Sequence, residues 1–124
     1  MGQPDIRGRS FVFSLRIIKL CQALKNDSIG RIILSQLLRS GTSIGANIEE
    51  AQAGQSKKDF LAKLSISRKE ARETLYWLRL IKESAILPAK RLNDIINECE
   101  QITKILSSII LTSRDGPKSP TPST

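Results

Sequence analysis

The stretch IGRIILSQLLRSGTSIGANIEEAQA, residues 29–53, decides the fold. Its apolar and small residues recur at spacings of four and three, which places them on one face of an α-helix. These residues are Ile29, Ile33, Leu37, Ser40, Ile44, Ile48 and Ala51. Glycine in a helix costs about 1 kcal/mol relative to alanine, so a break at Gly41 is the alternative. We expect one continuous helix, because the apolar phase is the same on both sides of Gly41 and Gly45.

Three further segments with the same period flank this helix. One covers residues 11–25, one covers residues 56–84, and the last starts near Pro88, which suits the first turn of a helix. Ser56 and Asp59 resemble a capping box at the start of the third helix. Because helices joined by short connections pack antiparallel, the sequence predicts an all-α protein, an antiparallel up-down-up-down four-helix bundle.

The domain organisation follows from where this pattern begins and ends. We expect the bundle to occupy residues 10–113, after a flexible N-terminus of residues 1–9. Residues 114–124 contain three prolines among Ser, Thr and Lys, which predicts a disordered tail.

The residue types present argue against an enzyme. The chain contains no histidine, which removes Ser-His-Asp and Cys-His nucleophilic sites and most catalytic zinc sites. No glycine-rich loop follows a predicted strand, so nucleotide-binding loops of the P-loop or Rossmann kind are absent. Cys21 and Cys99 are too few and too distant in sequence for a disulfide framework or a zinc finger, although antiparallel packing could make them neighbours in the core. We expect no enzyme activity and no metal, cofactor or small-molecule substrate.

The location follows from two absences in the sequence. There is no run of about 18 apolar residues of the kind that spans a membrane. The first ten residues, MGQPDIRGRS, lack the apolar region of a signal peptide. We therefore expect a cytoplasmic protein that does not contact a membrane.

The formal net charge is +8, and half of it falls on the third predicted helix. An excess of this size favours an acidic partner such as nucleic acid, whereas the alternative is that it serves solubility alone. Arg68, Arg72, Arg79 and Lys82 lie along one stripe at helical spacing, which could follow a phosphate backbone. The predicted nucleic-acid-binding residues are Lys57, Lys58, Arg68, Lys69, Arg72, Arg79 and Lys82.

Two observations bear on this basic stripe. A solvated face with local ion pairs, such as Arg68 or Lys69 with Glu73, is an equally good interpretation. No aromatic side chain interleaves the basic residues, as binders of single strands usually require. Duplexes or structured RNA, which proteins recognise by shape, therefore fit better than single strands.

The last turns of the third helix are apolar almost all the way round. One bundle core cannot cover every side of such a helix, so the excess surface predicts contact with another subunit or partner. Tyr76 and Trp77 are the expected anchors of that interface. The alternative is that Trp77 covers one end of the bundle.

Several segments together resemble the four-helix-bundle proteins encoded in intervening sequences of bacterial 23S ribosomal RNA genes, often labelled S23 ribosomal proteins. SIGANIEEA, residues 43–51, is similar to the Ser-Ile-x-x-Asn-Ile-x-Glu-Gly/Ala signature of that family. The preceding QLLRS of residues 36–40 fits the Gln-Leu-x-Arg that comes before the signature. Residues 56–60 and 69–79 resemble the third helix of the family, and residues 105–110 resemble the fourth.

The resemblance implies a four-helix bundle that assembles into a ring, commonly a homopentamer, with no known catalytic activity. A related branch is the accessory variability protein of diversity-generating retroelements, a basic pentameric barrel that binds its reverse transcriptase and RNA. The signature here is more similar to the intervening-sequence proteins. One departure is Ala51, where many members have glycine.

The polar positions of the family pattern are Arg39, Asn47, Glu50 and Glu73. Asn47 and Glu50 are three residues apart and share a helix face with small residues. If they are buried they need partners, which Arg39, Arg68 or Arg72 could supply. We interpret this cluster as one that fixes helix register or a subunit contact. Ligand recognition is the alternative.

Together these features predict a basic, non-enzymatic oligomeric scaffold that binds structured RNA or RNA/DNA. A nucleic-acid enzyme is a further expected partner. One alternative is an accessory protein of a diversity-generating retroelement that binds its reverse transcriptase. The other is a protein–protein interaction module whose charge is incidental.

Overall fold

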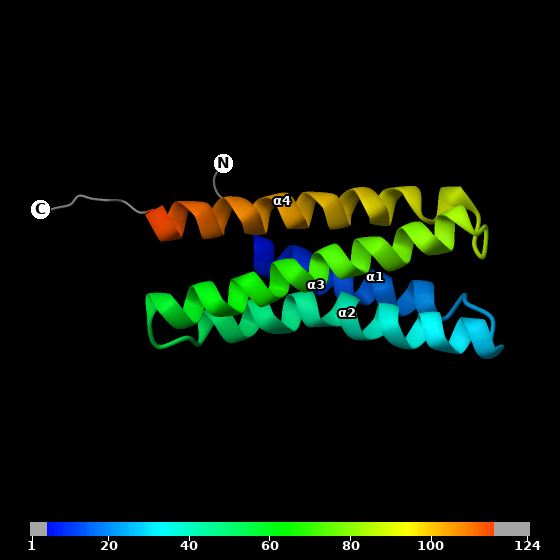
Figure 1. Cartoon of the computed structure of the whole chain (residues 1–124), viewed down its shortest axis with the longest axis horizontal. Coiled ribbons are helices and arrows are strands. Elements are labelled where there is room, and N and C mark those ends of the chain that lie inside the picture. The colour runs from blue at the N-terminus through cyan, green and yellow to red at the C-terminus, as the bar shows by residue number, and fades with distance from the viewer. Residues whose placement is uncertain (1–4, 116–124) are drawn as a thin grey trace, which may run out of the picture.

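Four long α-helices make up residues 5–115, the part of the chain that the computed structural model describes (Figure 1). They are α1 (Ile6–Cys21), α2 (Ser28–Gln52), α3 (Lys57–Glu83) and α4 (Asn93–Asp115), with a short 3-10 turn η1 (Ala89–Arg91) before α4. Consecutive helices run in opposite directions (Figure 1). The predicted all-α four-helix bundle is confirmed. No helix within the described residues is both long and apolar enough to cross a lipid bilayer.

Short polar side chains start the first three helices. The side chains of Asp5, Asp27 and Ser56 each accept a hydrogen bond from a backbone N–H three residues later, at 3.1, 2.7 and 3.0 Å. Such caps satisfy backbone donors that have no partner inside the helix. The cap at Ser56 was predicted from the sequence, whereas the cap at Asp5 was missed.

The helix ends differ from the predicted ones because of these caps. Capping by Asp5 lets α1 begin at Ile6, so residues 6–9, expected in a flexible N-terminus, form its first turn. At the other end α4 includes Arg114 and Asp115, which were expected in the tail. Residues 1–4 and 116–124 lie outside the described residues.

Helix α2 is continuous through Gly41 and Gly45, as predicted. A Cβ atom added at Gly41 would lie 2.9 Å from the Ile17 side chain, and one at Gly45 would lie 3.3 Å from the carbonyl oxygen of Ser10. Both glycines therefore allow α1 to approach α2 closely, which offsets their low helix propensity. The predicted surface of small residues is confirmed.

The core between the four helices is aliphatic apart from Phe13. Leu37, Ile44, Leu78 and Leu106 are fully buried there. Ile29, predicted on the buried face of α2, is instead 63% exposed. The inward position of that first turn is occupied by Gly30, which is buried.

Helix α3 ends in a tight reversal that leads to η1. The backbone N–H of Ala85 donates to Lys82 and that of Ile86 donates to Ile81, both at 3.1 Å. This pair of bonds is a Schellman motif. Ala85 has φ = 58°, a left-handed conformation that glycine adopts more easily. The reversal fixes where η1 and the start of α4 lie.

The two cysteines are free, buried and directed to different helix pairs. The Cys21 thiol on α1 faces the carbonyl oxygen of Leu34 on α2 at 4.0 Å. The Cys99 thiol on α4 faces the carbonyl oxygen of Ala71 on α3 at 3.2 Å. Each helix thus turns its cysteine away from the space between α1 and α4, and the expected pairing in the core is not found.

Candidate nucleic-acid interface

Helix α3 separates its carboxylates from most of its basic side chains. Glu70 and Glu73 turn toward α2, where Arg39 binds both of them. The distance from Arg39 Nη1 to Glu70 Oε1 is 3.1 Å. The indole Nε1 of Trp77 donates to Glu73 at 3.0 Å. Arg39 therefore neutralises two of the acidic residues of α3 from the neighbouring helix.

The basic residues of α3 are left without counterions as a result. None of the seven predicted binding residues forms an ion pair with any residue between 5 and 115. Arg68 contacts the Ser107 hydroxyl on α4 at 3.5 Å, and Arg72 is exposed. The alternative in which Arg68 or Lys69 pairs with Glu73 is wrong, because Glu73 is bound by Arg39.

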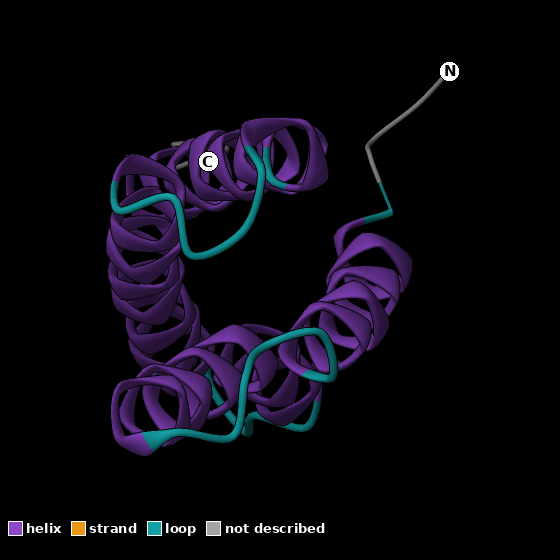
Figure 2. Ribbon diagram, turned by 90° about the vertical axis from the view of Figure 1, so that its right-hand side faces the viewer, coloured by secondary structure: helices purple, strands orange, loops and turns teal. Residues whose placement is uncertain are grey.

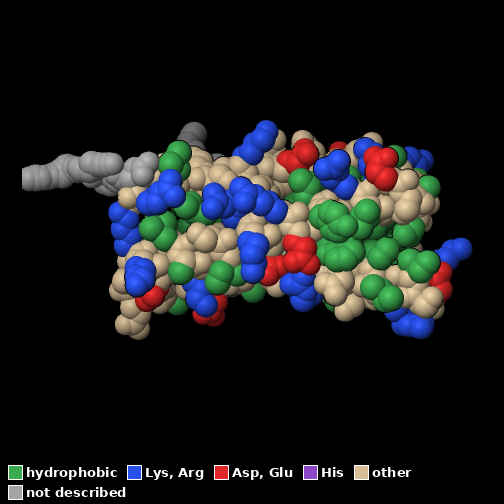
Figure 3. Space-filling model, viewed as in Figure 1, with side chains coloured by type: hydrophobic (Ala, Val, Ile, Leu, Met, Phe, Trp, Pro, Cys, Tyr) green, Lys and Arg blue, Asp and Glu red, His purple; other side chains and the backbone are tan. Residues whose placement is uncertain are grey.

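Helix α4 adds to this basic surface. The Arg68 guanidinium reaches the Ser107 hydroxyl, and Lys104 is one turn before Ser107, so Lys104 lies near Arg68 on the adjoining helix. Figure 3 shows Lys and Arg side chains gathered over α3 and α4, in the half of the molecule nearer the C-terminus. We call this the α3/α4 basic surface, which consists of Lys57, Lys58, Arg68, Lys69, Arg72 and Lys104. Lys104 was missed because its neighbours depend on the register of two helices.

The other two predicted residues lie apart from most of this surface. Arg79 and Lys82 are in the last two turns of α3, and Lys82 is half-buried. Glu83 follows directly after Lys82. The predicted basic stripe therefore keeps its most concentrated charge in the first two thirds of α3.

The predicted polar cluster is only partly assembled. Arg39 and Glu73 are bound to each other, together with Glu70, which the sequence did not indicate. Asn47 is half-buried, and its amide donates to the backbone carbonyl of Ser43 at 2.8 Å. Glu50 is exposed, and its carboxylate makes no hydrogen bond or ion pair with the described residues. Among the described residues neither Asn47 nor the Glu50 carboxylate is bound by an arginine, so the partners that burial would have required are not used.

An apolar patch covers the α2/α3 face near the end of α3. Arg39 on α2 binds Glu73 on α3, and the two helices run in opposite directions. Ile32, two turns before Arg39, and Leu80, two turns after Glu73, therefore lie on the same face. Tyr76 is 58% exposed, and its ring meets that of Trp77 edge-on at 5.3 Å. We call this the α2/α3 apolar patch, which consists of Ile29, Ile32, Tyr76, Trp77 and Leu80. It is the large hydrophobic area in Figure 3.

A second apolar surface lies on α1. Phe11, Leu15 and Ile18 follow one another at helical spacing and are 64%, 52% and 41% exposed. We call these three residues the α1 apolar face. Beside Phe11 a pocket of about 210 Å³ opens between α1 and α2, lined mainly by small residues such as Ser14 and Gly45. The helical pattern of residues 11–25 did not reveal that these three residues are exposed.

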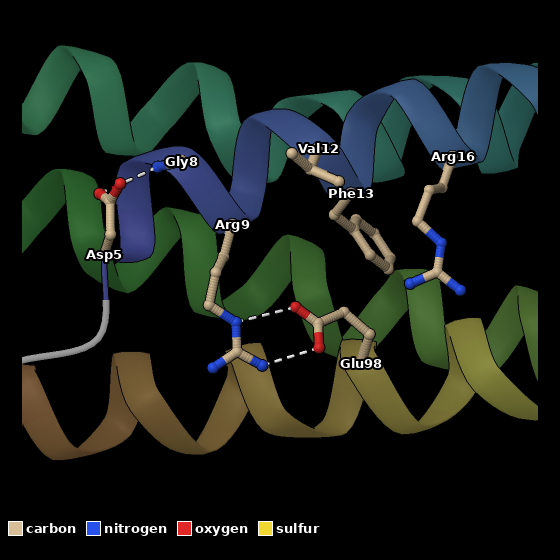
Figure 4. Close-up of a pocket in the computed structure, with 7 residues that line it drawn as sticks. All are labelled: Asp5, Gly8, Arg9, Val12, Phe13, Arg16 and Glu98. Carbon is tan, nitrogen blue, oxygen red and sulfur yellow. Dashed lines mark hydrogen bonds and ion pairs between the residues drawn. The ribbon is translucent and has the colours of Figure 1, made fainter.

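We call the contact between α1 and α4 the α1/α4 seam, and these two helices are the most widely spaced neighbours in Figure 2. Arg9 on α1 bridges it by a bidentate pair with Glu98 on α4, with N···O distances of 2.9 and 2.7 Å (Figure 4). This hydrogen bonding raises the pKa of the Arg9 guanidinium above its ordinary value. A pocket of about 340 Å³ opens beside the pair, lined also by Val12, Phe13 and Arg16.

Comparison with known proteins now places the chain in a family. The family described as 23S rRNA-intervening sequence protein matches residues 3–108. The chain belongs to this family. The resemblance drawn from the sequence is thus confirmed at the level of the family, while the relation to retroelement accessory proteins stays a prediction. The comparison with curated proteins gave no match.

A solved member of the 23S rRNA-intervening sequence family has the same fold. It is the crystal structure of a protein with unknown function, from the S23 ribosomal protein family of Bacteroides thetaiotaomicron VPI-5482. The two chains are 43% identical, and their structures superpose with a TM-score of 0.82. The match covers 86% of this chain and 99% of the other. The four-helix bundle is therefore shared by the two proteins.

Proposed function

We propose that this chain is a non-enzymatic subunit of a cytoplasmic, basic homo-oligomeric scaffold that binds structured RNA or RNA/DNA duplexes. The observation that carries the proposal is the α3/α4 basic surface, whose cations have no counterion among the described residues. Cations already paired with carboxylates release few counterions when a phosphate arrives, whereas unpaired ones supply the main driving force of non-specific binding.

The kind of nucleic acid is inferred from what the basic surface carries. From Lys58 to Arg72 it extends about 21 Å along α3, at about 1.5 Å per residue. Phe60, the aromatic residue between Lys58 and Arg72, packs against the core, whereas base stacking on exposed aromatic rings is the usual basis of single-strand binding. A duplex or a structured RNA, held through its phosphates, is the better ligand.

Assembly is supported by the two exposed apolar surfaces. The α1 apolar face and the α2/α3 apolar patch consist of different residues on different helices. Contact between two different surfaces of identical chains is heterologous, and it closes into a ring when the rotation permits. The pentamer implied by the family resemblance is such a ring. Tyr76 and Trp77 then act as interface anchors.

A protein partner is the second candidate function, and the same α2/α3 apolar patch favours it. A nucleic-acid enzyme bound there, such as the reverse transcriptase of a diversity-generating retroelement, would make this chain an accessory protein. In the remaining alternative the chain binds only proteins and its charge is incidental. These functions differ in their dependence on salt, because an apolar interface responds little to ionic strength.

Nucleic-acid binding is tested by salt titration. Labelled structured RNA, RNA–DNA hybrid and duplex DNA are titrated with the wild type, with Arg68→Ala/Arg72→Ala and with the control Lys25→Ala/Arg31→Ala. The control removes the same charge from exposed positions elsewhere. We expect the first variant to lower the magnitude of the log–log salt slope on duplex DNA by about 1.8. Equal slopes for both variants would remove the basic surface from the proposal.

Assembly is tested by light scattering on two variants. Phe11→Ser/Leu15→Ser disrupts the α1 apolar face, and Tyr76→Ser/Leu80→Ser disrupts the α2/α3 apolar patch. Each should lower the oligomer mass alone. Mixed together they should give a dimer, because each variant retains the surface that the other has lost. Failure of the mixture to associate would contradict contact between these two surfaces.

A further inference from the structure

The α1/α4 seam brings three basic side chains together beyond the Arg9–Glu98 pair. A pocket of about 170 Å³ is lined by Arg16, Lys19, Leu20, Arg91 and Ile95. Leu20 and Ile95 are 5% and 3% exposed, so they form its floor. Arg16 and Lys19 come from α1, while Arg91 comes from η1. We call the three basic residues of this pocket the seam site.

The charges in the seam site are uncompensated. No carboxylate lines the pocket among the described residues. The side chains of Arg16, Lys19 and Arg91 make no hydrogen bond or ion pair within the described part of the chain. Figure 4 shows Arg16 reaching from α1 toward α4, while Glu98 is bound by Arg9.

The register of α1 against α4 places two arginines opposite each other in the seam site. Arg9 lies opposite Glu98, and the helices are antiparallel. Two turns further along α1 is Arg16, and the corresponding position seven residues before Glu98 is Arg91. The seam therefore places Arg9 across from a carboxylate, whereas two turns further along it places Arg16 across from a second arginine. Like charges held this close repel each other unless an anion lies between them.

The helix dipole accounts for only one of these residues. Lys19 lies in the last turn of α1, where the negative end of the helix favours a cation. Arg16 is one turn earlier, and Arg91 belongs to a different element. Their convergence over an apolar floor needs another explanation.

We propose that the seam site binds a phosphate group of the nucleic acid and thereby provides a second contact in addition to the α3/α4 basic surface. This inference rests on the function proposed above. Arginine guanidinium groups match the oxygens of a phosphate in bidentate geometry, and two of them converge here. The pocket is smaller than the roughly 300–1,000 Å³ of typical small-molecule sites. It suits a phosphate presented from outside better than a whole nucleotide.

The two contacts lie on opposite sides of α4. Arg91 and Lys104 are thirteen residues apart in the sequence, which corresponds to about 20 Å along the helix axis. That is a little over half a duplex turn of about 34–36 Å. Asp94 and Glu100 are exposed on α4 between them. The two surfaces are therefore separate contact points and not one continuous channel.

The test uses the full chain and the same salt titrations. Arg16→Ala/Arg91→Ala is compared with Lys25→Ala/Arg31→Ala, which removes equal charge away from both surfaces. We expect the seam variant to lower the magnitude of the salt slope on duplex DNA by about 1.8, and the control to leave it almost unchanged. Equal slopes for the two variants would overturn the seam site while leaving the proposed function intact. Absence of salt-dependent binding by the wild type would overturn both.

A second variant separates binding from folding. Arg91→Glu places a carboxylate opposite Arg16, as Glu98 is placed opposite Arg9. We expect its Tm to equal or exceed that of the wild type while its affinity for nucleic acid falls more than with Lys25→Glu. Unchanged affinity would contradict the inference.

Pyrophosphate distinguishes a nucleic-acid phosphate from a free one. We expect it to compete with duplex DNA for the wild type and less well for Arg16→Ala/Arg91→Ala. If pyrophosphate raises the Tm of the wild type through these arginines and does not compete with nucleic acid, the site serves a free anion. The proposed ligand is then wrong.

Discussion

The contact between α2 and α3 and the seam between α1 and α4 join helices in opposite ways. At the first, the Ser67 hydroxyl donates to the carbonyl oxygen of Ile44 at 2.8 Å, and the hydroxyls of Thr74 and Ser40 are hydrogen bonded at 2.9 Å. These short side chains are all buried. At the α1/α4 seam, an ion pair between the long side chains of Arg9 and Glu98 bridges the helices, and a pocket opens on each side of Arg16.

This difference shows how side-chain length divides the bundle into a scaffold and a binding side. Short polar groups satisfy each other inside a close helix contact, so they add specificity without exposing charge. Long charged side chains hold their helices further apart and keep their heads in water. Both proposed phosphate-binding surfaces therefore adjoin α4, while the most extensive helix contact lies between α2 and α3.

Truncating one core isoleucine at the α2/α3 contact and one at the α1/α4 seam should have the largest effect on the free energy of unfolding. Ile44→Ala at the α2/α3 contact removes a fully buried side chain, and Ile95→Ala removes one that is 3% exposed at the seam. We expect the free energy of unfolding to fall by about 4 kcal/mol for Ile44→Ala and by about 2 kcal/mol for Ile95→Ala. The second loss is smaller because a site beside an open pocket relaxes or fills with water more easily. Chemical denaturation at one protein concentration measures both. A larger loss for Ile95→Ala would reverse the comparison.

The loss of stability at alkaline pH should be the next largest effect, and it comes from the cysteines buried at the α1/α2 and α3/α4 contacts. Burial raises the pKa of Cys99 from 9.0 to about 12 and that of Cys21 to about 11. An unfolded thiol ionises above pH 9 while the folded one stays protonated, so this stability is present below pH 9 and is lost as the pH rises. Each thiol should account for about 2 kcal/mol between pH 9 and 10.5.

Alanine variants isolate this loss from the other groups that titrate at high pH. The free energy of unfolding is measured across pH 8–10.5 for the wild type and for Cys99→Ala. The variant should lose about 2 kcal/mol less than the wild type over that range. Parallel curves would mean that Cys99 is more accessible to water than its position between α3 and α4 implies.

A double-mutant cycle measures the polar pair at the α2/α3 contact. Thr74→Val leaves the buried Ser40 hydroxyl without its partner at 2.9 Å. We expect Thr74→Val to lower the free energy of unfolding by roughly 1–2 kcal/mol. Thr74→Val/Ser40→Ala should recover part of it, since both partners are then apolar. If the double variant loses the sum of the two single losses, the hydroxyls are not coupled.

The fold could be predicted from the sequence because it depends on local periodicity. The apolar phase of α2 continued across Gly41, and the structure has one helix there. The start of α1 was missed because Asp5 caps it before the clearest part of the apolar pattern begins. A short polar residue followed by Ile6 was the available signal, and it is weak without a capping partner.

The candidate site was harder to predict, because it depends on register between helices. The cations of α3 were visible in the sequence, but their lack of counterions depends on Arg39 binding Glu70 and Glu73 from α2. Likewise Arg16 and Arg91 are 75 residues apart in the sequence and gain their relation only from the antiparallel seam. Composition gave the sign of the charge and not its arrangement.

The smallest expected effect concerns the ion pair that bridges the seam. The Arg9 and Glu98 side chains are 35% and 22% exposed, whereas those of the nearby Arg7–Glu49 pair are 54% and 57% exposed. A double-mutant cycle on Arg9 and Glu98 should give a coupling of about 0.5–1 kcal/mol that falls with salt. The cycle on Arg7 and Glu49 should give less, because water screens that pair more completely.

The same pair links stability to the proposed ligand. Glu98→Ala frees Arg9, which lies two turns from Arg16 on the same side of α1. If the seam accepts phosphate, this variant should be slightly less stable and should bind nucleic acid more tightly, with a salt slope larger in magnitude by up to about 0.9. Glu49→Ala is the matched control, since it removes one carboxylate and frees Arg7 outside the seam. Equal gains from both variants would mean that net charge alone governs binding, and the open seam would then have no special part in it.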